Sequence, residues 1–70
     1  MMKTIDARGR SCPEPVMMTR AALQESAEGV TMLVDNICAV ENITRYAAHE
    51  GYEVTREDGA DDYALTLAKK

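Results

Sequence analysis

Large aromatic side chains are nearly absent from this chain of 70 residues, which contains no Trp, no Phe and three Tyr. The core must therefore be built mostly from aliphatic side chains and Ala. Five Met are present, and we expect them to fill gaps in the core rather than to form an adaptable contact surface. Because so short a chain buries only roughly 60% of its unfolded surface, we expect one domain over residues 1–70 with its chemistry at the surface.

Cysteine and histidine are also scarce, with two Cys that form no CxxC pair and a single His. This pattern argues against a zinc site, and we predict neither a metal nor a bound cofactor. Basic residues number 8 against 12 acidic ones, which gives a net charge of −4. Since affinity for nucleic acid comes mostly from neutralised phosphates, we do not expect direct nucleic-acid binding.

Long apolar runs are missing as well. No stretch approaches the roughly 20 apolar residues that cross a bilayer, and residues 1–6 lack the apolar core of a signal peptide. We therefore expect no membrane partner and a cytoplasmic location. In that compartment the two cysteines are expected to be free thiols rather than a structural disulfide.

The first third of the chain predicts a strand, a turn and a helix. Residues 4–6 form a short extended segment, and Gly9 suits a turn that needs a positive φ. Proline is well tolerated in the first helical turn, so we expect Cys12 to be the N-cap and Pro13 the first residue of a helix that ends near Glu25. One stripe of this helix should carry Val16, Arg20 and Leu23, with Met17 beside it.

The middle of the chain predicts a buried strand and a second helix. Residues 30–34 are nearly all apolar, as in a central strand covered by helices. Asp35-Asn36 then supplies a cap for a helix over about residues 37–50, and Gly51 provides its left-handed C-terminal cap. The buried face of this helix should carry Val40, Ile43 and Ala47.

The last third predicts an antiparallel hairpin. Residues 52–56 and 63–67 alternate in polarity, and Asp58-Gly59 between them is a turn signal. The element order is then β-α-β-α-β-β. We therefore predict an α+β fold, a two-layer sandwich in which two helices pack on one face of a four-stranded mixed sheet.

The densest chemical signal is Cys12-Pro13-Glu14-Pro15, because two prolines in one turn restrict the backbone beside a thiol. A thiol at a helix N-terminus faces the positive end of the macrodipole, which can lower its pKa from ~8.5 to roughly 3.5–7.5. Arg8 and Arg10 would add to this effect, whereas Glu14 would oppose it. A thiolate attacks sulfur electrophiles, so Cys12 is our candidate nucleophile. The alternative is that Cys12 is a small buried residue that precedes a proline.

Residues 6–16 read Asp-Ala-Arg-Gly-Arg-Ser-Cys-Pro-Glu-Pro-Val, and this segment resembles the N-terminal signature of the TusA/SirA-like sulfur-carrier family. The resemblance extends over essentially the whole chain. It implies that Cys12 accepts a persulfide from a cysteine desulfurase and passes the sulfur to an acceptor protein, as in relays that end in tRNA 2-thiouridine or molybdenum cofactor. The supporting motif residues would be Arg8, Gly9, Pro13, Glu14 and Pro15.

The second half of the chain narrows the resemblance. The residues that are similar to the N-terminal domain of YedF-type proteins are Val34-Asp35-Asn36, Ala39, Glu41-Asn42-Ile43, Arg45 and Gly51-Tyr52-Glu53-Val54. In that subgroup a DsrE-like domain commonly follows and selenium metabolism is implicated, so a DsrE-like domain is a further candidate partner. The family usually has Leu where this chain has Arg10, which bears on how a partner docks.

A domain without a deep pocket must present Cys12 to its partner, so the docking surface should surround the start of the first helix. We expect Arg10 and Arg20 to dock the partner, together with Arg8, because the rest of the chain is acidic. Two other functions stay open. One is a non-catalytic regulatory or interaction module, and the other is a thiol redox switch between Cys12 and Cys38.

The remaining polar residues have simpler interpretations. Cys38 is expected to be a small packing residue unless it pairs with Cys12, and His49 suits the negative end of the second helix. Asp35 and Asn36 should cap that helix, although strand ends in α/β sheets can also line a site. Residues 57–62 are acidic and are predicted to be a solvated turn.

Overall fold

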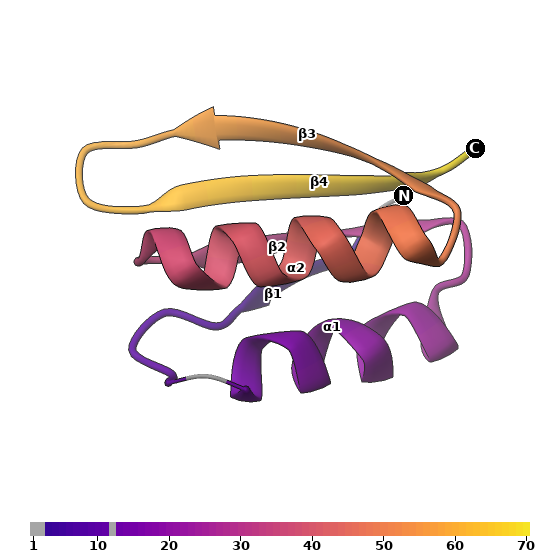
Figure 1. The fold of residues 1–70 in the computed structure, drawn as a ribbon, viewed down its shortest axis with the longest axis horizontal. Helices are drawn as coiled ribbons and strands as arrows, with labels where there is room; N and C mark the ends of the chain where they lie inside the picture. Colours follow the sequence, from indigo (N-terminus) through magenta and orange to yellow (C-terminus); the bar gives the residue numbers. More distant parts are fainter. Residues whose placement is uncertain (1–2, 12) are drawn as a thin grey trace.

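The computed structural model describes residues 3–11 and 13–70, and the predicted element order is present in it (Figure 1). Cys12 and the first two residues lie outside the described part of the chain. The elements are β1 (Lys3–Asp6), α1 (Glu14–Glu25), β2 (Gly29–Val34), α2 (Ile37–His49), β3 (Tyr52–Asp58) and β4 (Tyr63–Lys69). Neither helix in the described ranges is long and apolar enough to cross a membrane.

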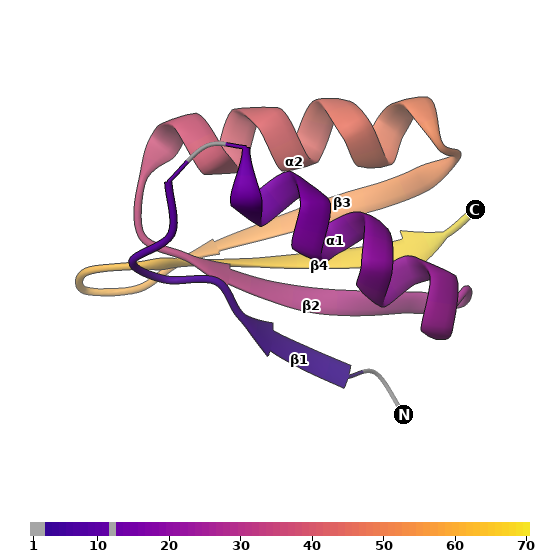
Figure 2. The same ribbon diagram turned by 90° about the horizontal axis from the view of Figure 1, so that it is seen from below.

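The four strands form one mixed sheet in the order β1-β2-β4-β3. β1 runs parallel to β2, whereas β4 is antiparallel to both of its neighbours. Both helices cover the same face of this sheet, and the opposite face is left open (Figure 2). The predicted two-layer architecture is confirmed.

The core lies between the helices and the covered face of the sheet. Val30, Met32 and Val34 on β2 are completely buried there, and Leu65 and Leu67 on the neighbouring β4 are equally buried. The alternate β2 residues at positions 31 and 33 are only half-buried because they face the open side. The nearly all-apolar segment is therefore a central strand, as predicted, but it is covered on one face only. Met32 confirms a core role for at least one methionine.

Helix α2 matches its prediction closely. Val40, Ile43 and Ala47 are buried on the face toward the sheet. The Asn36 side chain accepts a hydrogen bond from the Ala39 N–H at 2.8 Å, which caps the N-terminus. After the helix, Gly51 adopts a φ of 86°, the left-handed conformation expected of a C-terminal cap.

Helix α1 departs from its prediction at its start. Pro13 is the N-cap, with a φ of −101°, and the first helical residue is Glu14. The prediction of Pro13 as the first helical residue is therefore wrong, and the companion prediction of Cys12 as N-cap falls on a residue outside the described part. Pro15, at the second helical position, takes the role assigned to Pro13, since its missing N–H would have had no helical partner there.

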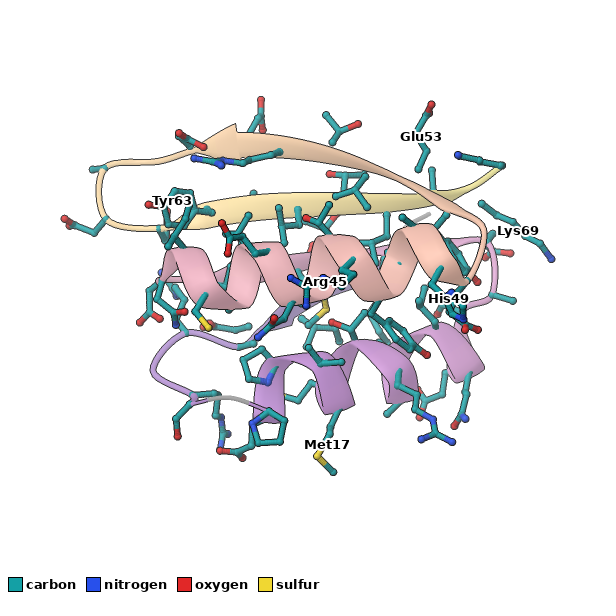
Figure 3. The ribbon with its side chains drawn as sticks, in the orientation of Figure 1. Met17, Arg45, His49, Glu53, Tyr63 and Lys69 are labelled. Atoms are coloured by element: carbon teal, nitrogen blue, oxygen red, sulfur yellow. The ribbon has the colours of Figure 1, made fainter. Side chains whose placement is uncertain are left out.

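The buried stripe of α1 matches its prediction in part, because Leu23 is buried and the half-buried Val16 packs against the core. Its buried residues are Pro15, Thr19, Ala22 and Leu23. Arg20 is exposed, and Met17 is 62% exposed and points away from α2 (Figure 3). The reason is Thr19, whose hydroxyl donates a hydrogen bond to the Pro15 carbonyl at 2.9 Å and can therefore be buried without cost to an unpaired polar group.

Candidate functional site

The Cys12 motif lies at the end of the sheet where three segments meet. Residues 7–11 connect β1 to α1, and they lie at the same end of the molecule as the start of α2 and the β3–β4 turn (Figures 1 and 2). Cys12 itself lies outside the described residues. The site is therefore built from its neighbours in the chain and from the groups that hold them.

The residues on either side of position 12 are exposed, and the chain after it is well anchored. Ser11 and Pro13 are both exposed. The Glu14 N–H donates to the Ser11 carbonyl at 2.9 Å, and the Met17 N–H donates to the Pro13 carbonyl at 3.1 Å. Pro15 is buried beneath this turn. The motif thus joins a helix start, which backbone hydrogen bonds and the buried Pro15 restrain, to an accessible surface.

Arg8 is held by two carboxylates from different parts of the chain. Its guanidinium donates two hydrogen bonds of 2.9 Å to the Asp6 carboxylate and one of 3.1 Å to Asp62. These hydrogen bonds from Arg8 lower the pKa of Asp6 to about 2. The Asp6 carboxylate in turn raises the pKa of Arg8, and Asp62 contributes less to this shift. Arg8 therefore ties the motif loop to the β3–β4 turn, and its charge is balanced.

Asp35 holds the same loop from the end of β2. Gly9 has a φ of 78°, so a residue with a side chain would be strained there. The Gly9 N–H donates to Asp35 Oδ2 at 2.8 Å, and the Ala7 N–H donates to the Leu33 carbonyl, also at 2.8 Å. Of the expected capping pair, Asn36 caps α2 and Asp35 contacts the motif loop. The capping role predicted for Asp35 is corrected.

The arginines predicted to dock a partner differ in their surroundings. Arg10 Nη1 lies 3.5 Å from Oε2 of Glu14, four residues later in the chain, and both side chains are about half exposed. Such exposed pairs are weak, but this one still compensates charge locally. Arg20 is exposed and forms no ion pair within residues 3–11 and 13–70. Only Arg20 of the three therefore offers an uncompensated charge to a partner.

Sequence reasoning missed an open groove between the two helices. Its volume is about 520 Å³. It is lined by the N-cap Pro13 and by Val16 of α1 on one side, and by Asn42, Arg45, Tyr46 and His49 of α2 on the other. The four α2 residues follow the spacing i, i+3, i+4 and i+7, which places them on one stripe of the helix. That spacing was readable in the sequence, but it lies beside the buried stripe and was not recognised as a second face.

The second cysteine is a free, exposed thiol in the first turn of α2. Its Sγ accepts a long contact of 3.6 Å from the Asn42 side-chain amide. The expectation that Cys38 packs in the interior is therefore wrong, because this position faces outward from α2. A pairing of Cys38 with Cys12 stays a prediction. Within the described residues, no three His, Cys, Asp or Glu side chains gather in a metal-binding arrangement.

Comparison with known proteins adds independent information. A family model described as sulfurtransferase TusA matches residues 3–69. A protein of Methanocaldococcus jannaschii, described as a candidate sulfur carrier protein, is 38% identical over an alignment of 71 positions. The alignment covers 99% of this chain and 95% of that protein. The crystal structure of a SirA-like protein from Desulfitobacterium hafniense matches with a TM-score of 0.87 at 37% identity, covering 96% of each chain.

Proposed function

The chain belongs to the TusA/SirA-like family of sulfur carriers, and from this premise we propose that Cys12 receives a persulfide from a cysteine desulfurase and relays it to an acceptor protein. The observation that carries the proposal is the arrangement around position 12. Exposed flanking residues adjoin a helix start that is anchored by backbone hydrogen bonds and by the buried Pro15. This geometry supports a thiol that meets its partner at the surface in a restrained direction.

The transfer is an exchange between a thiolate and a persulfide and needs no oxidant. The Cys12 thiolate attacks the terminal sulfur of the donor persulfide, and the bond between that sulfur and the donor cysteine sulfur breaks. The donor cysteine leaves as a thiolate, and Cys12 becomes the persulfide. A second exchange of the same kind gives the sulfur to a thiolate of the acceptor, for which a DsrE-like domain is one candidate.

The described residues give this exchange electrostatic support. The N-terminal end of α1 carries the partial positive charge of a helix of 12 residues, which favours a thiolate close to it. Arg8 does not compete for that thiolate, since its guanidinium is occupied by Asp6 and Asp62. Its role in this proposal is to position the loop.

The decisive test is mass spectrometry of the whole chain after incubation with a cysteine desulfurase and cysteine. We expect one added sulfur on Cys12, retained in Cys38→Ser and absent from Cys12→Ser. An internal disulfide between Cys12 and Cys38 would instead indicate a redox switch. An unchanged mass with an active desulfurase would contradict sulfur carriage and favour a regulatory or interaction module.

A further inference from the structure

We propose that the groove between α1 and α2 binds an extended acidic segment of the protein that exchanges sulfur with Cys12. In this arrangement an aliphatic side chain of the segment enters the groove, and a carboxylate of the segment lies against Arg45 and His49. The proposal rests on the sulfur-transfer function for the identity of the partner. The chemistry of the occupant is argued from the groove itself.

The position of the groove couples it to the motif. Pro13 lines the groove and directly follows Cys12 in the chain, so a segment bound there contacts the neighbour of the reactive residue. The volume of about 520 Å³ falls within the range of roughly 300–1,000 Å³ typical of small-molecule sites. That is enough for one or two side chains of a peptide rather than for a folded element.

The lining favours an occupant that is partly apolar. Val16 and Pro13 contribute aliphatic surface from α1, and the half-buried Tyr46 contributes its ring from α2. Polar groups are confined to the α2 side. An aliphatic side chain would therefore bury its surface against α1 while its backbone and neighbouring side chains face α2.

The charge of the lining favours an acidic occupant. In the described chain, Lys3, Arg8, Arg10 and Arg56 pair with carboxylates. Among the basic side chains without such a pair, Arg45 is the one that lines this groove. Arg45 and His49 are exposed and have no ion pair with any described residue, although the chain carries a net charge of −4. Figure 3 shows both side chains on α2. An unpaired arginine beside an apolar groove suits a carboxylate, which its planar guanidinium can bind with two hydrogen bonds.

The neighbouring hollow along the same helix pair limits where that carboxylate can lie. Tyr46 lines both hollows, and the lining of the second one also includes Arg20 and Glu50. The negative charge of Glu50 there offsets the positive charge of Arg20, whereas no carboxylate lines the first groove. The favourable place for the negative charge is therefore the α2 side of the groove, near Arg45 and His49.

The test uses the full chain carrying Cys12→Ser, so that binding is measured without sulfur transfer. The probe is the peptide Glu-Leu-Asp-Leu-Glu, with Leu→Ser and acid→amide versions as controls, and the readout is NMR chemical-shift change. We expect the largest changes at Val16, Arg45 and Tyr46. Arg45→Glu should weaken binding roughly tenfold, as expected for reversal of a paired charge, whereas Lys69→Glu, an equal change of net charge outside the groove, should have little effect.

The outcomes separate this inference from the proposed function. If Cys12 is loaded but the peptide does not bind at millimolar concentration, the groove is not the docking site, and sulfur carriage is unaffected. Peptide binding without loading of Cys12 would contradict sulfur carriage while leaving the groove as a binding site for an acidic segment. Equal weakening by Arg45→Glu and Lys69→Glu would show only general electrostatic attraction and would overturn the site, as would stronger shifts of the groove residues by a single-stranded RNA oligonucleotide.

Discussion

Two adjacent residues allow loop positioning to be separated from helix stability. Asp35 accepts a hydrogen bond of 2.8 Å from Gly9 in the motif loop, and Asn36 accepts one of 2.8 Å from Ala39 in α2. Both side chains are exposed. Either Ala variant removes one hydrogen bond of 2.8 Å, and both remove the long one of 3.5 Å that Asn36 Nδ2 donates to Asp35 Oδ1. Only the bond between Asp35 and Gly9 leads to the Cys12 motif.

The two variants should cost similar amounts of stability. Loss of a helix cap costs about 1 kcal/mol, and loss of the exposed hydrogen bond to Gly9 costs about 0.5–1 kcal/mol. In a domain of this size each 1 kcal/mol lowers Tm by about 4–8 °C. Thermal unfolding followed by circular dichroism should therefore show two similarly destabilised variants that are both still folded at 25 °C.

Their sulfur loading should differ, because only Asp35→Ala releases the loop before Cys12. We expect loading by a cysteine desulfurase to slow several-fold in Asp35→Ala and to stay near the original rate in Asn36→Ala. Asp35→Asn serves as the control, since its amide oxygen can still accept from Gly9 while the charge is lost. Equal loading rates for the two Ala variants, at matched fractions folded, would refute the positioning role of Asp35.

Most of the fold could be predicted because its signals are local. The alternation in β3 and β4, the Asp58-Gly59 turn and the left-handed Gly51 are each set by a few neighbouring residues. The Gly59 N–H indeed donates to the Asp62 carbonyl at 2.8 Å in that turn. Such short-range patterns decide the element type before any tertiary contact forms.

The buried face of α1 includes a polar residue, Thr19, that the sequence pattern did not predict. Thr19 is completely buried, yet a pattern based on apolar residues places a threonine on the outer face. Its hydrogen bond to the Pro15 carbonyl makes burial acceptable. The prediction was therefore wrong at Arg20, which is exposed, while Leu23 is buried and Val16 packs against the core as expected.

The site was predictable only where it is continuous in sequence. The Cys12-Pro13-Glu14-Pro15 motif is a local pattern and was found directly. The contact between Arg8 and Asp62 spans 54 residues, and no pattern in either segment points to the other. The groove has the same origin, since Val16 and Arg45 come from different helices and meet only when both pack on one sheet.

Three further predictions follow from charged groups around the motif. Asp6 should titrate by NMR with a midpoint near 2, and the stability it adds should be present above about pH 4 and lost as pH falls toward 2, because its folded-state pKa is lowered. A single-thiol variant that keeps Cys12 should be alkylated at lower pH than an unstructured peptide thiol, and equal midpoints would remove the basis for an activated nucleophile. Charge reversal at Arg20 should slow transfer from a desulfurase more than reversal at Arg10, since Arg10 already pairs with Glu14 and offers a partner less free charge. Contacts at an interface rim act mainly on association rate, so both effects should shrink as salt rises. Stopped-flow transfer rates across a salt series would measure this, with reaction of Cys12 toward a small disulfide as the control. Equal slowing of both reactions would mean that the arginines act on the thiol and not on the partner.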